Sequence, residues 1–277
     1  MRPILILALA VLPSSLAAAP PLQIVRAILS QMDGGASDPP GFEHTAGEVV
    51  FFSCRIAGYT KSENEKVQLR SSVQAFDPKG IPLDEIYKNE MTVDVSPQDK
   101  DWQPKIATSL ALPPLAPPGD YKIVVKAEDV LANTSAELSV PFKLRGHAVE
   151  PSDTLIVRNF QFFRDEDGTR PAEKPLYKPG DGVFAKFDII GFHYGDHNKI
   201  DVSYVTSVIA PGGKVLWTQP EPAAEQSESF YPKHYVPASM GISLTPTIRP
   251  GEYTISVAVK DAVGGRTYEA KFPFTIQ

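Results

Sequence analysis

A stretch near the middle of the chain recurs near its end, and this repeat constrains the fold more than any other feature. The sequence PGDYKIVV begins at Pro118, and the related sequence PGEYTISV begins at Pro250, 132 residues later. At an offset one residue longer, Gly47 pairs with Gly180 and Gly58 with Gly191. The chain therefore contains two copies of one domain. Features found in only one copy are candidates for function, because the shared fold does not need them.

The repeat boundaries predict two domains of ordinary size, residues 22–145 and 152–277, joined by a short polar linker. Residues 1–17 are predicted to be a cleaved signal peptide, with Arg2 as the positive start, an apolar run over residues 4–12 and small residues before the cleavage site. Nine apolar residues are too few to cross a membrane of about 30 Å, and no second apolar segment follows. The protein is therefore expected to be secreted or periplasmic and not membrane-spanning.

Composition favours short strands and excludes some partners. The chain has 27 prolines, which favour strands joined by rigid turns over long helices. Its single cysteine, Cys54, cannot form an internal disulfide, so each domain must rely on core packing. The formal net charge is −6, and no run of Lys and Arg with interleaved aromatics occurs. Nucleic acid is therefore not an expected partner.

Alternation of apolar and polar residues predicts a strand at residues 121–127 and again at 253–259. The remaining expected strands are 24–29, 49–56, 67–76, 106–112 and 136–144 in the first domain, and 155–163, 182–190, 200–209, 240–244 and 270–276 in the second. Turn signals such as Pro211-Gly212-Gly213 separate them. Six or seven strands per domain predict an all-β fold of two antiparallel β-sandwiches.

The repeated Gly-x-Tyr-x-Ile segment resembles the corner before the sixth strand of immunoglobulin-like domains. Tyr121 and Tyr253 stand where that family has a tyrosine that hydrogen-bonds to backbone. The resemblance implies that Ile123 and Ile255 replace a disulfide cysteine. An ordinary tight turn before a strand is the alternative.

The second half shows a closer resemblance to macroglobulin-type Ig-like domains, such as those found in tandem in bacterial proteins. Its sequence YKPGDGV from Tyr177 is followed by PGGK from Pro211 and PGEYTI from Pro250, in the order typical of that family. The first half keeps this pattern less well. The resemblance implies a fold and no particular function, because such modules act as spacers, scaffolds and binding domains.

The sequence contains no recognisable catalytic motif: no Gly-x-Ser-x-Gly elbow, His-Glu-x-x-His helix or phosphate-binding loop. No catalytic residue, cofactor or metal ligand is therefore predicted. The segment FHYGDH is the nearest approach to a site, and its His193, Tyr194 and His197 are candidates for recognition because the first domain lacks them. Transition-metal binding by the two histidines, or a simple solvated hairpin tip, are the alternatives. The acidic run at Asp165 resembles a calcium loop, but Leu176 occupies the place of the required glutamate, which favours an acidic turn.

Aromatic residues in the second domain suggest a second type of site. Trp217, Tyr231 and Tyr235, with Trp102 of the first domain, are candidates for a sugar-stacking platform. Tyr231 and Tyr235 are expected in an exposed loop within an irregular segment, residues 218–240, and residues 85–103 form a similarly long polar segment in the first domain. Long loops of this type are usually functional or mobile.

Together these features predict a non-catalytic extracytoplasmic protein whose two Ig-like domains act as a binding or scaffolding module. The expected partner is another envelope or extracellular protein. Carbohydrate binding through exposed aromatics is the first alternative, and a metal-dependent enzyme is the second.

Overall fold

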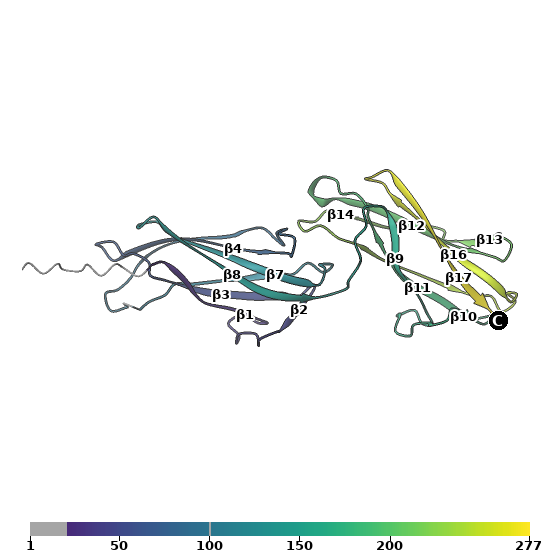
Figure 1. Cartoon of the computed structure of the whole chain (residues 1–277), viewed down its shortest axis with the longest axis horizontal. Coiled ribbons are helices and arrows are strands. Elements are labelled where there is room, and N and C mark those ends of the chain that lie inside the picture. Colours follow the sequence, from purple (N-terminus) through teal and green to yellow (C-terminus); the bar gives the residue numbers. More distant parts are fainter. Residues whose placement is uncertain (1–20, 100) are drawn as a thin grey trace, which may run out of the picture.

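The computed structural model describes residues 21–99 and 101–277. Their regular secondary structure consists of strands and one short 3-10 helix, η1 (Asp196–Asn198). The predicted signal peptide, residues 1–17, lies outside the described residues. The strands build four sheets, which lie as two successive β-sandwiches along an elongated molecule (Figure 1). No helix within the described part of the chain has the length and apolar character that a membrane crossing requires.

The N-terminal sandwich packs a three-stranded sheet against a five-stranded one. The first sheet has the order β1 (Gln23–Ser30), β3 (Val49–Ala57), β6 (Lys105–Ala111). The second has the order β2 (Glu43–Thr45), β8 (Thr134–Arg145), β7 (Gly119–Asp129), β4 (Lys66–Phe76), β5 (Tyr87–Asp94). All pairs are antiparallel except β2 with β8.

The C-terminal sandwich repeats this topology. Its smaller sheet has the order β15 (Val236–Ser243), β11 (Gly182–Ile190), β9 (Ile156–Phe163). Its larger sheet has the order β10 (Leu176–Tyr177), β17 (Arg266–Ile276), β16 (Gly251–Asp261), β12 (Ile200–Ile209), β13 (Val215–Thr218), and β14 (Ala223–Ser227) also pairs with β12. This arrangement of strands in two facing sheets is that of an immunoglobulin-like sandwich, so the predicted fold class is confirmed.

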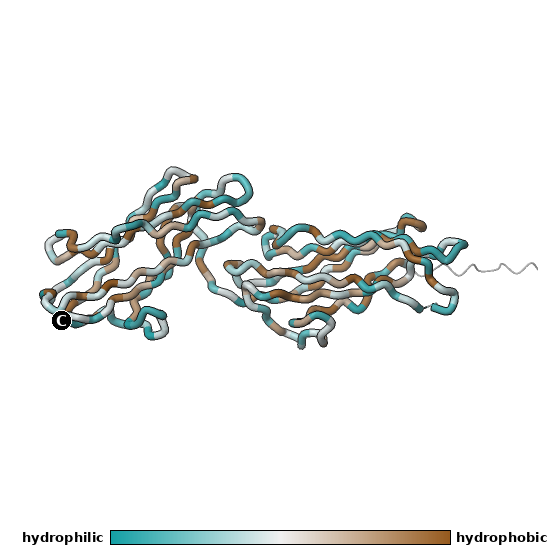
Figure 2. The backbone as a smooth tube through the Cα atoms, turned by 180° about the vertical axis from the view of Figure 1, so that it is seen from behind, coloured by the Kyte–Doolittle hydropathy of each residue, from teal (hydrophilic) through white to brown (hydrophobic). Residues whose placement is uncertain are grey.

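Each sandwich has its own hydrophobic core, built from the inward-facing residues of both sheets. Figure 2 shows apolar positions along the strands of both halves. Cys54 on β3 is buried in the N-terminal core, and its counterpart at the same strand position of β11 is the buried Phe187. The thiol therefore fills a packing position.

Both predicted tyrosine corners are present. The hydroxyl of Tyr121 donates to the backbone oxygen of Pro117 at 2.6 Å, and that of Tyr253 donates to the backbone oxygen of Arg249 at 2.8 Å. Ile123 and Ile255, two residues further along, are fully buried. Apolar packing thus occupies the place where many Ig domains have a disulfide.

The two long segments expected to be irregular contain strands that the sequence pattern did not reveal. Strand β5 lies within residues 85–103, while β14 and the start of β15 lie within residues 218–240. Both β5 and β14 are at the edge of a sheet, where polar side chains face solvent and charged residues oppose pairing with other chains. Burial still alternates along both strands, but neither contains a fully buried residue, and their mostly polar composition hides this alternation in the sequence.

Candidate functional site

Two loops of the C-terminal sandwich lie together at the joint with the N-terminal sandwich. The first, residues 192–198, contains the candidate residues His193, Tyr194 and His197, and the second spans residues 228–235. The side-chain amide of Asn198 donates to the backbone oxygens of Ser229 (3.1 Å) and Phe230 (2.7 Å). The hydroxyl of Tyr194 donates to the backbone oxygen of Lys233 at 2.6 Å. The first loop therefore holds the second in place.

Tyr231 does not lie on an exposed loop, so that prediction was wrong. Its side chain is only 6% exposed and belongs to the hydrophobic core of the N-terminal sandwich. Its hydroxyl donates to the carboxylate of Asp77 at 3.1 Å and lies 3.1 Å from Nε2 of His234. The physical reason is that the second sandwich inserts this ring into the first, where burial of an aromatic ring is more favourable than exposure.

The polar groups around Tyr231 are arranged to receive its hydroxyl. The other carboxylate oxygen of Asp77 accepts from the backbone N–H groups of Lys79 (2.9 Å) and Ile81 (2.7 Å). Burial raises the pKa of Tyr231 far above its usual value, so the phenol stays protonated and can donate. Burial lowers the pKa of His234, and the charge of Lys79 lowers it further. The neutral imidazole is therefore favoured in the assembled joint.

Tyr235 is also buried, at 7% exposure, which overturns its predicted place on an exposed platform. Its ring packs edge-on against His147 of the joint segment, with 5.3 Å between ring centroids. Nε2 of His147 lies 2.7 Å from the carboxylate of Asp188, and the amide of Asn159 donates to the same oxygen at 2.7 Å. Tyr235 therefore contacts His147 in the segment that links the sandwiches, whereas the sequence suggested that it contacts a ligand.

The two candidate histidines have separate surroundings. The backbone N–H of His193 donates to the buried carboxylate of Asp261 at 2.9 Å, and its ring Nδ1 lies 3.2 Å from the same oxygen. His197 is exposed within η1 and has a left-handed backbone, with φ of 56°. Across residues 21–99 and 101–277, no group of three or more His, Cys, Asp or Glu is arranged to hold a metal ion.

Of the aromatics predicted to form a sugar-stacking platform, Trp217 is exposed, at 37%. It belongs to β13, whose Val215 and Leu216 are also exposed. Its ring lines a groove of about 560 Å³ that extends from the edge strands to the outer face of the smaller sheet. The groove is also lined by Phe163, Asp165, Glu166, Phe184, Lys186, Ser239 and Gly241.

A second hollow of about 930 Å³ continues the groove along the same outer face toward the joint. The two hollows share Phe163, Lys186 and Ser239. At the joint end, the second hollow is lined by the His147–Asp188–Asn159 cluster and by Tyr235. We call the two hollows together the outer groove. Both volumes fall in the range usual for ligand pockets, about 300–1,000 Å³.

Sequence reasoning missed Phe184, which lines the first hollow of the outer groove. Cβ atoms built on Gly182 and Gly241 would meet the Phe184 ring at 2.6 and 2.9 Å, so the ring lies over both glycines. In the N-terminal sandwich the same strand positions hold Phe51, Val49 and Ser109. The signal in the sequence is therefore the change of two flanking positions to glycine in one repeat.

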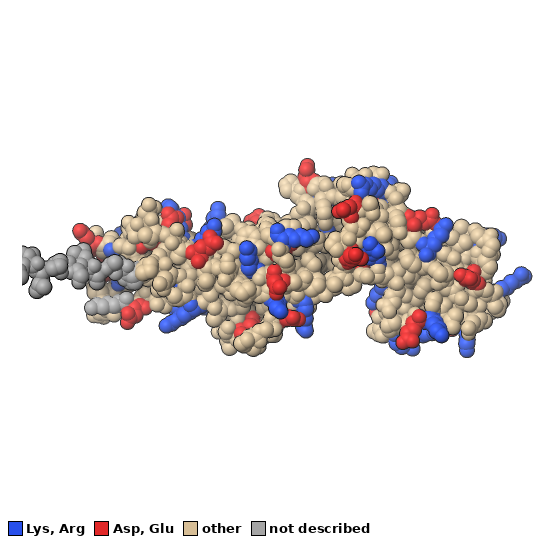
Figure 3. Space-filling model, in the orientation of Figure 1, with Lys and Arg blue, Asp and Glu red and all other residues tan. Residues whose placement is uncertain are grey.

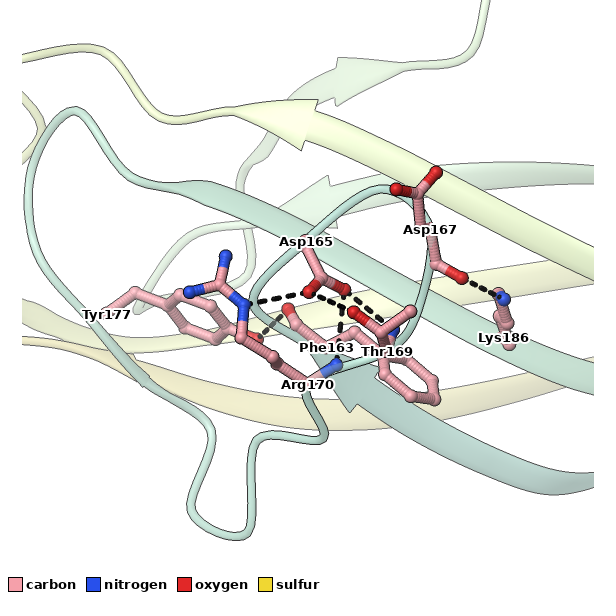
Figure 4. Close-up of polar contacts among 7 residues, drawn as sticks. All are labelled: Phe163, Asp165, Asp167, Thr169, Arg170, Tyr177 and Lys186. Atoms are coloured by element: carbon pink, nitrogen blue, oxygen red, sulfur yellow. Dashed lines mark hydrogen bonds and ion pairs between the residues drawn. The ribbon is translucent and has the colours of Figure 1, made fainter.

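The acidic turn after β9 contributes Asp165 and Glu166 to the lining of the outer groove. Figure 4 shows the polar contacts of this turn. The carboxylate of Asp165 accepts from the backbone N–H and hydroxyl of Thr169 (2.8 and 2.7 Å) and from Nε of Arg170 (2.8 Å). These bonds, that from Arg170 above all, hold the pKa of Asp165 well below its usual value. The carboxylate therefore stabilises its own turn, as expected for an acidic turn.

Comparisons with known proteins find structural likeness only. No family model matches the chain, and no curated protein matches it. Among solved structures, the C-terminal domain of the Streptococcus agalactiae AgI/II polypeptide BspA is similar at 12% identity and a TM-score of 0.31, covering 91% of this chain and 100% of that chain. A second structure, described as BspA_C_WT, gives 13% identity and a TM-score of 0.30, covering 93% of this chain and all of that chain. The native conformation of E. coli alpha-2-macroglobulin gives 9% identity and a TM-score of 0.29, covering 85% of this chain and 16% of that chain. At such low scores these likenesses assign no function to the chain.

Proposed function

We propose that the chain is a non-catalytic extracytoplasmic binding module. In this proposal residues 22–145 and 152–277 are two Ig-like domains held in a fixed relative position, and they present binding surfaces to another envelope or extracellular protein. In this proposal residues 1–17 direct export and are then removed by cleavage. N-terminal sequencing of the exported protein is expected to begin at Ala18, and retention of Met1 would contradict the export step.

The observation that carries the proposal is the insertion of Tyr231 into the core of the neighbouring sandwich. A flexible spacer needs no such contact, because a short linker alone joins its domains. Here the Tyr231 side chain from residues 228–235 is buried, with 6% of its surface exposed, and its hydroxyl hydrogen-bonds to Asp77. Fixed geometry is useful to a module that aligns surfaces of both domains toward a partner.

The surface best suited to a protein partner is the β13 edge. Strand β13 carries the exposed apolar side chains Val215, Leu216 and Trp217 and no charge. The topologically equivalent β5 of the N-terminal sandwich carries Lys88 and Glu90. Charges on an edge strand prevent pairing with other chains, whereas an apolar edge favours it. Figure 3 shows Lys, Arg, Asp and Glu interspersed on one face of the molecule, without a large area of a single sign.

The proposal is tested by site-specific photo-crosslinking in the native envelope. A photoreactive residue at Leu216 on β13 is expected to give a discrete crosslinked product, and the same residue at Thr92 on β5 serves as the matched control. Val215→Lys should abolish the product, because it places a charge on the apolar edge. Absence of any product specific to Leu216, or a product that survives Val215→Lys, would contradict a protein-binding role for this edge.

A further inference from the structure

We propose that the outer groove of the C-terminal sandwich binds a neutral saccharide chain, with the ring of Phe184 as its stacking surface. This inference rests on the proposed function only in taking the chain to be a binding module. It does not depend on protein docking at the β13 edge, and the two are tested with different variants.

Phe184 presents its ring on the outer face of the smaller sheet. Its ring lies over Gly182 and Gly241, which have no side chains to cover it, and it lines the groove. One face of the ring is therefore supported by backbone while the ring remains accessible within the groove. In the N-terminal sandwich, Val49 and Ser109 flank the equivalent Phe51 and occupy the space that the glycines leave open. The C-terminal repeat thus has an aromatic surface that the fold itself does not require.

This face of the sheet allows recognition by side chains only. The floor of the groove is β11, whose backbone is already paired with β9 on one side and β15 on the other. A ligand lying over this strand must be recognised by side chains, because the ladder bonds of the strand are already formed. An added polypeptide strand needs free backbone groups at a sheet edge, so it does not fit this position.

Polar side chains line the groove wall. Lys186 and Ser239 line both hollows and Gln161 lines the second, and together they offer both hydrogen-bond donors and acceptors. The ammonium of Lys186 donates to the backbone oxygen of Asp167 at 2.6 Å and lies 5.7 Å from the ring centroid of Phe163, which fixes the side chain in the groove (Figure 4). Apolar surface with a few fixed polar groups is typical of small-ligand sites and suits a sugar ring, which has apolar faces and a hydroxyl rim.

The charges lining the groove indicate a neutral saccharide. Asp165, Glu166 and Asp188 line it together with one lysine, Lys186. Asp165 is paired with Arg170 and Asp188 with His147, so the lining has no excess of positive charge to attract an anion. Carboxylates repel uronate and sulfate groups, so anionic saccharides are disfavoured. The groove also extends past one ring, from Trp217 at the β13 edge to Tyr235 near the joint. A chain of several sugar units fits this length better than a monosaccharide does.

The test is isothermal titration of the full mature chain with cellohexaose and chitohexaose as neutral probes and hexagalacturonate as the anionic probe. At least one neutral hexasaccharide is expected to bind, and more tightly than hexagalacturonate. Phe184→Ala should weaken that binding about ten-fold or more, the scale of one lost aromatic contact. The matched control Phe51→Ala, at the same strand position of the other sandwich, should leave it unchanged.

Two further variants keep the test decisive if Phe184→Ala fails to fold. Gly241→Ser introduces serine, the residue that the N-terminal sandwich has at the equivalent position, and should displace the Phe184 ring. Gln161→Ala removes an exposed hydrogen-bonding group. Both should weaken saccharide binding in a folded protein. Absence of binding to both neutral probes, or equal losses in Phe184→Ala and Phe51→Ala, would overturn the inference. Val215→Lys should abolish the crosslink at Leu216 but leave saccharide binding in place. Its effect therefore distinguishes failure of the saccharide proposal from failure of the protein-docking proposal.

Discussion

The Tyr231→Ala substitution should uncouple the two sandwiches. Tyr231 is 6% exposed within the N-terminal core, and truncating a buried aromatic to alanine costs about 3–5 kcal/mol of unfolding free energy. The substitution also removes the hydroxyl that donates to the buried Asp77, and an unsatisfied buried group costs about 1–3 kcal/mol. Water entering the joint offsets part of the second loss. We therefore expect a total of at least about 3 kcal/mol.

Urea unfolding followed by circular dichroism measures this loss, and small-angle X-ray scattering measures the interdomain geometry. Tyr231→Ala is expected to lower the unfolding midpoint and to broaden the distribution of molecular dimensions. Tyr231→Phe keeps the ring and removes only the hydrogen bond, so its loss should be about 1–2 kcal/mol.

Phe230→Ala is the matched control, because Phe230 is the neighbouring aromatic in the same loop and is half exposed. Its effect should stay within about 0.5 kcal/mol, as for most surface substitutions. Equal effects of Tyr231→Ala and Phe230→Ala, or unchanged scattering in Tyr231→Ala, would refute the reasoning that this ring fixes the joint.

Four further predictions concern the joint, the corners and the cores. Burial lowers the pKa of His234 below its usual value of 6.5, so the neutral imidazole contributes stability that is complete above pH 6.5 and is lost as pH falls toward the pKa of the folded state. Small-angle X-ray scattering at a series of pH values should show the joint loosening on acidification. His234→Gln should reduce this pH dependence. Tyr253→Phe should cost about 1 kcal/mol in urea unfolding by removing the bond to Arg249, and an unchanged midpoint would mean that the corner contributes nothing. Burial raises the pKa of Cys54 to about 11, so thiol reagents at mildly alkaline pH should label it only after unfolding. Gly191→Ala should cost more than about 2 kcal/mol in the same unfolding assay, because φ is +74° there and the new Cβ would meet the backbone oxygen of Thr154 at 2.0 Å.

The candidate site divides into residues that the sequence could indicate and residues that it could not. His193, Tyr194 and His197 occur in one repeat only, and for this reason the sequence indicated their loop as a candidate site. The sequence did not reveal that the loop supports residues 228–235 at the joint, because Asn198 reaches Ser229 and Phe230 only in the folded chain. Whether these candidates bind a ligand stays a prediction.

The sequence by itself determined the strand periodicity, the tyrosine corners and the repeated fold. These depend on alternation and on turn residues close together in the chain, as in the segments from Pro118 and from Pro250. The tertiary structure alone decided which aromatic rings are buried. Exposure depends on contacts between distant segments: Tyr231 meets Asp77 across 154 positions, and Phe184 meets Gly241 across a strand pair. An aromatic residue in a polar segment is compatible with both outcomes until those partners are in place.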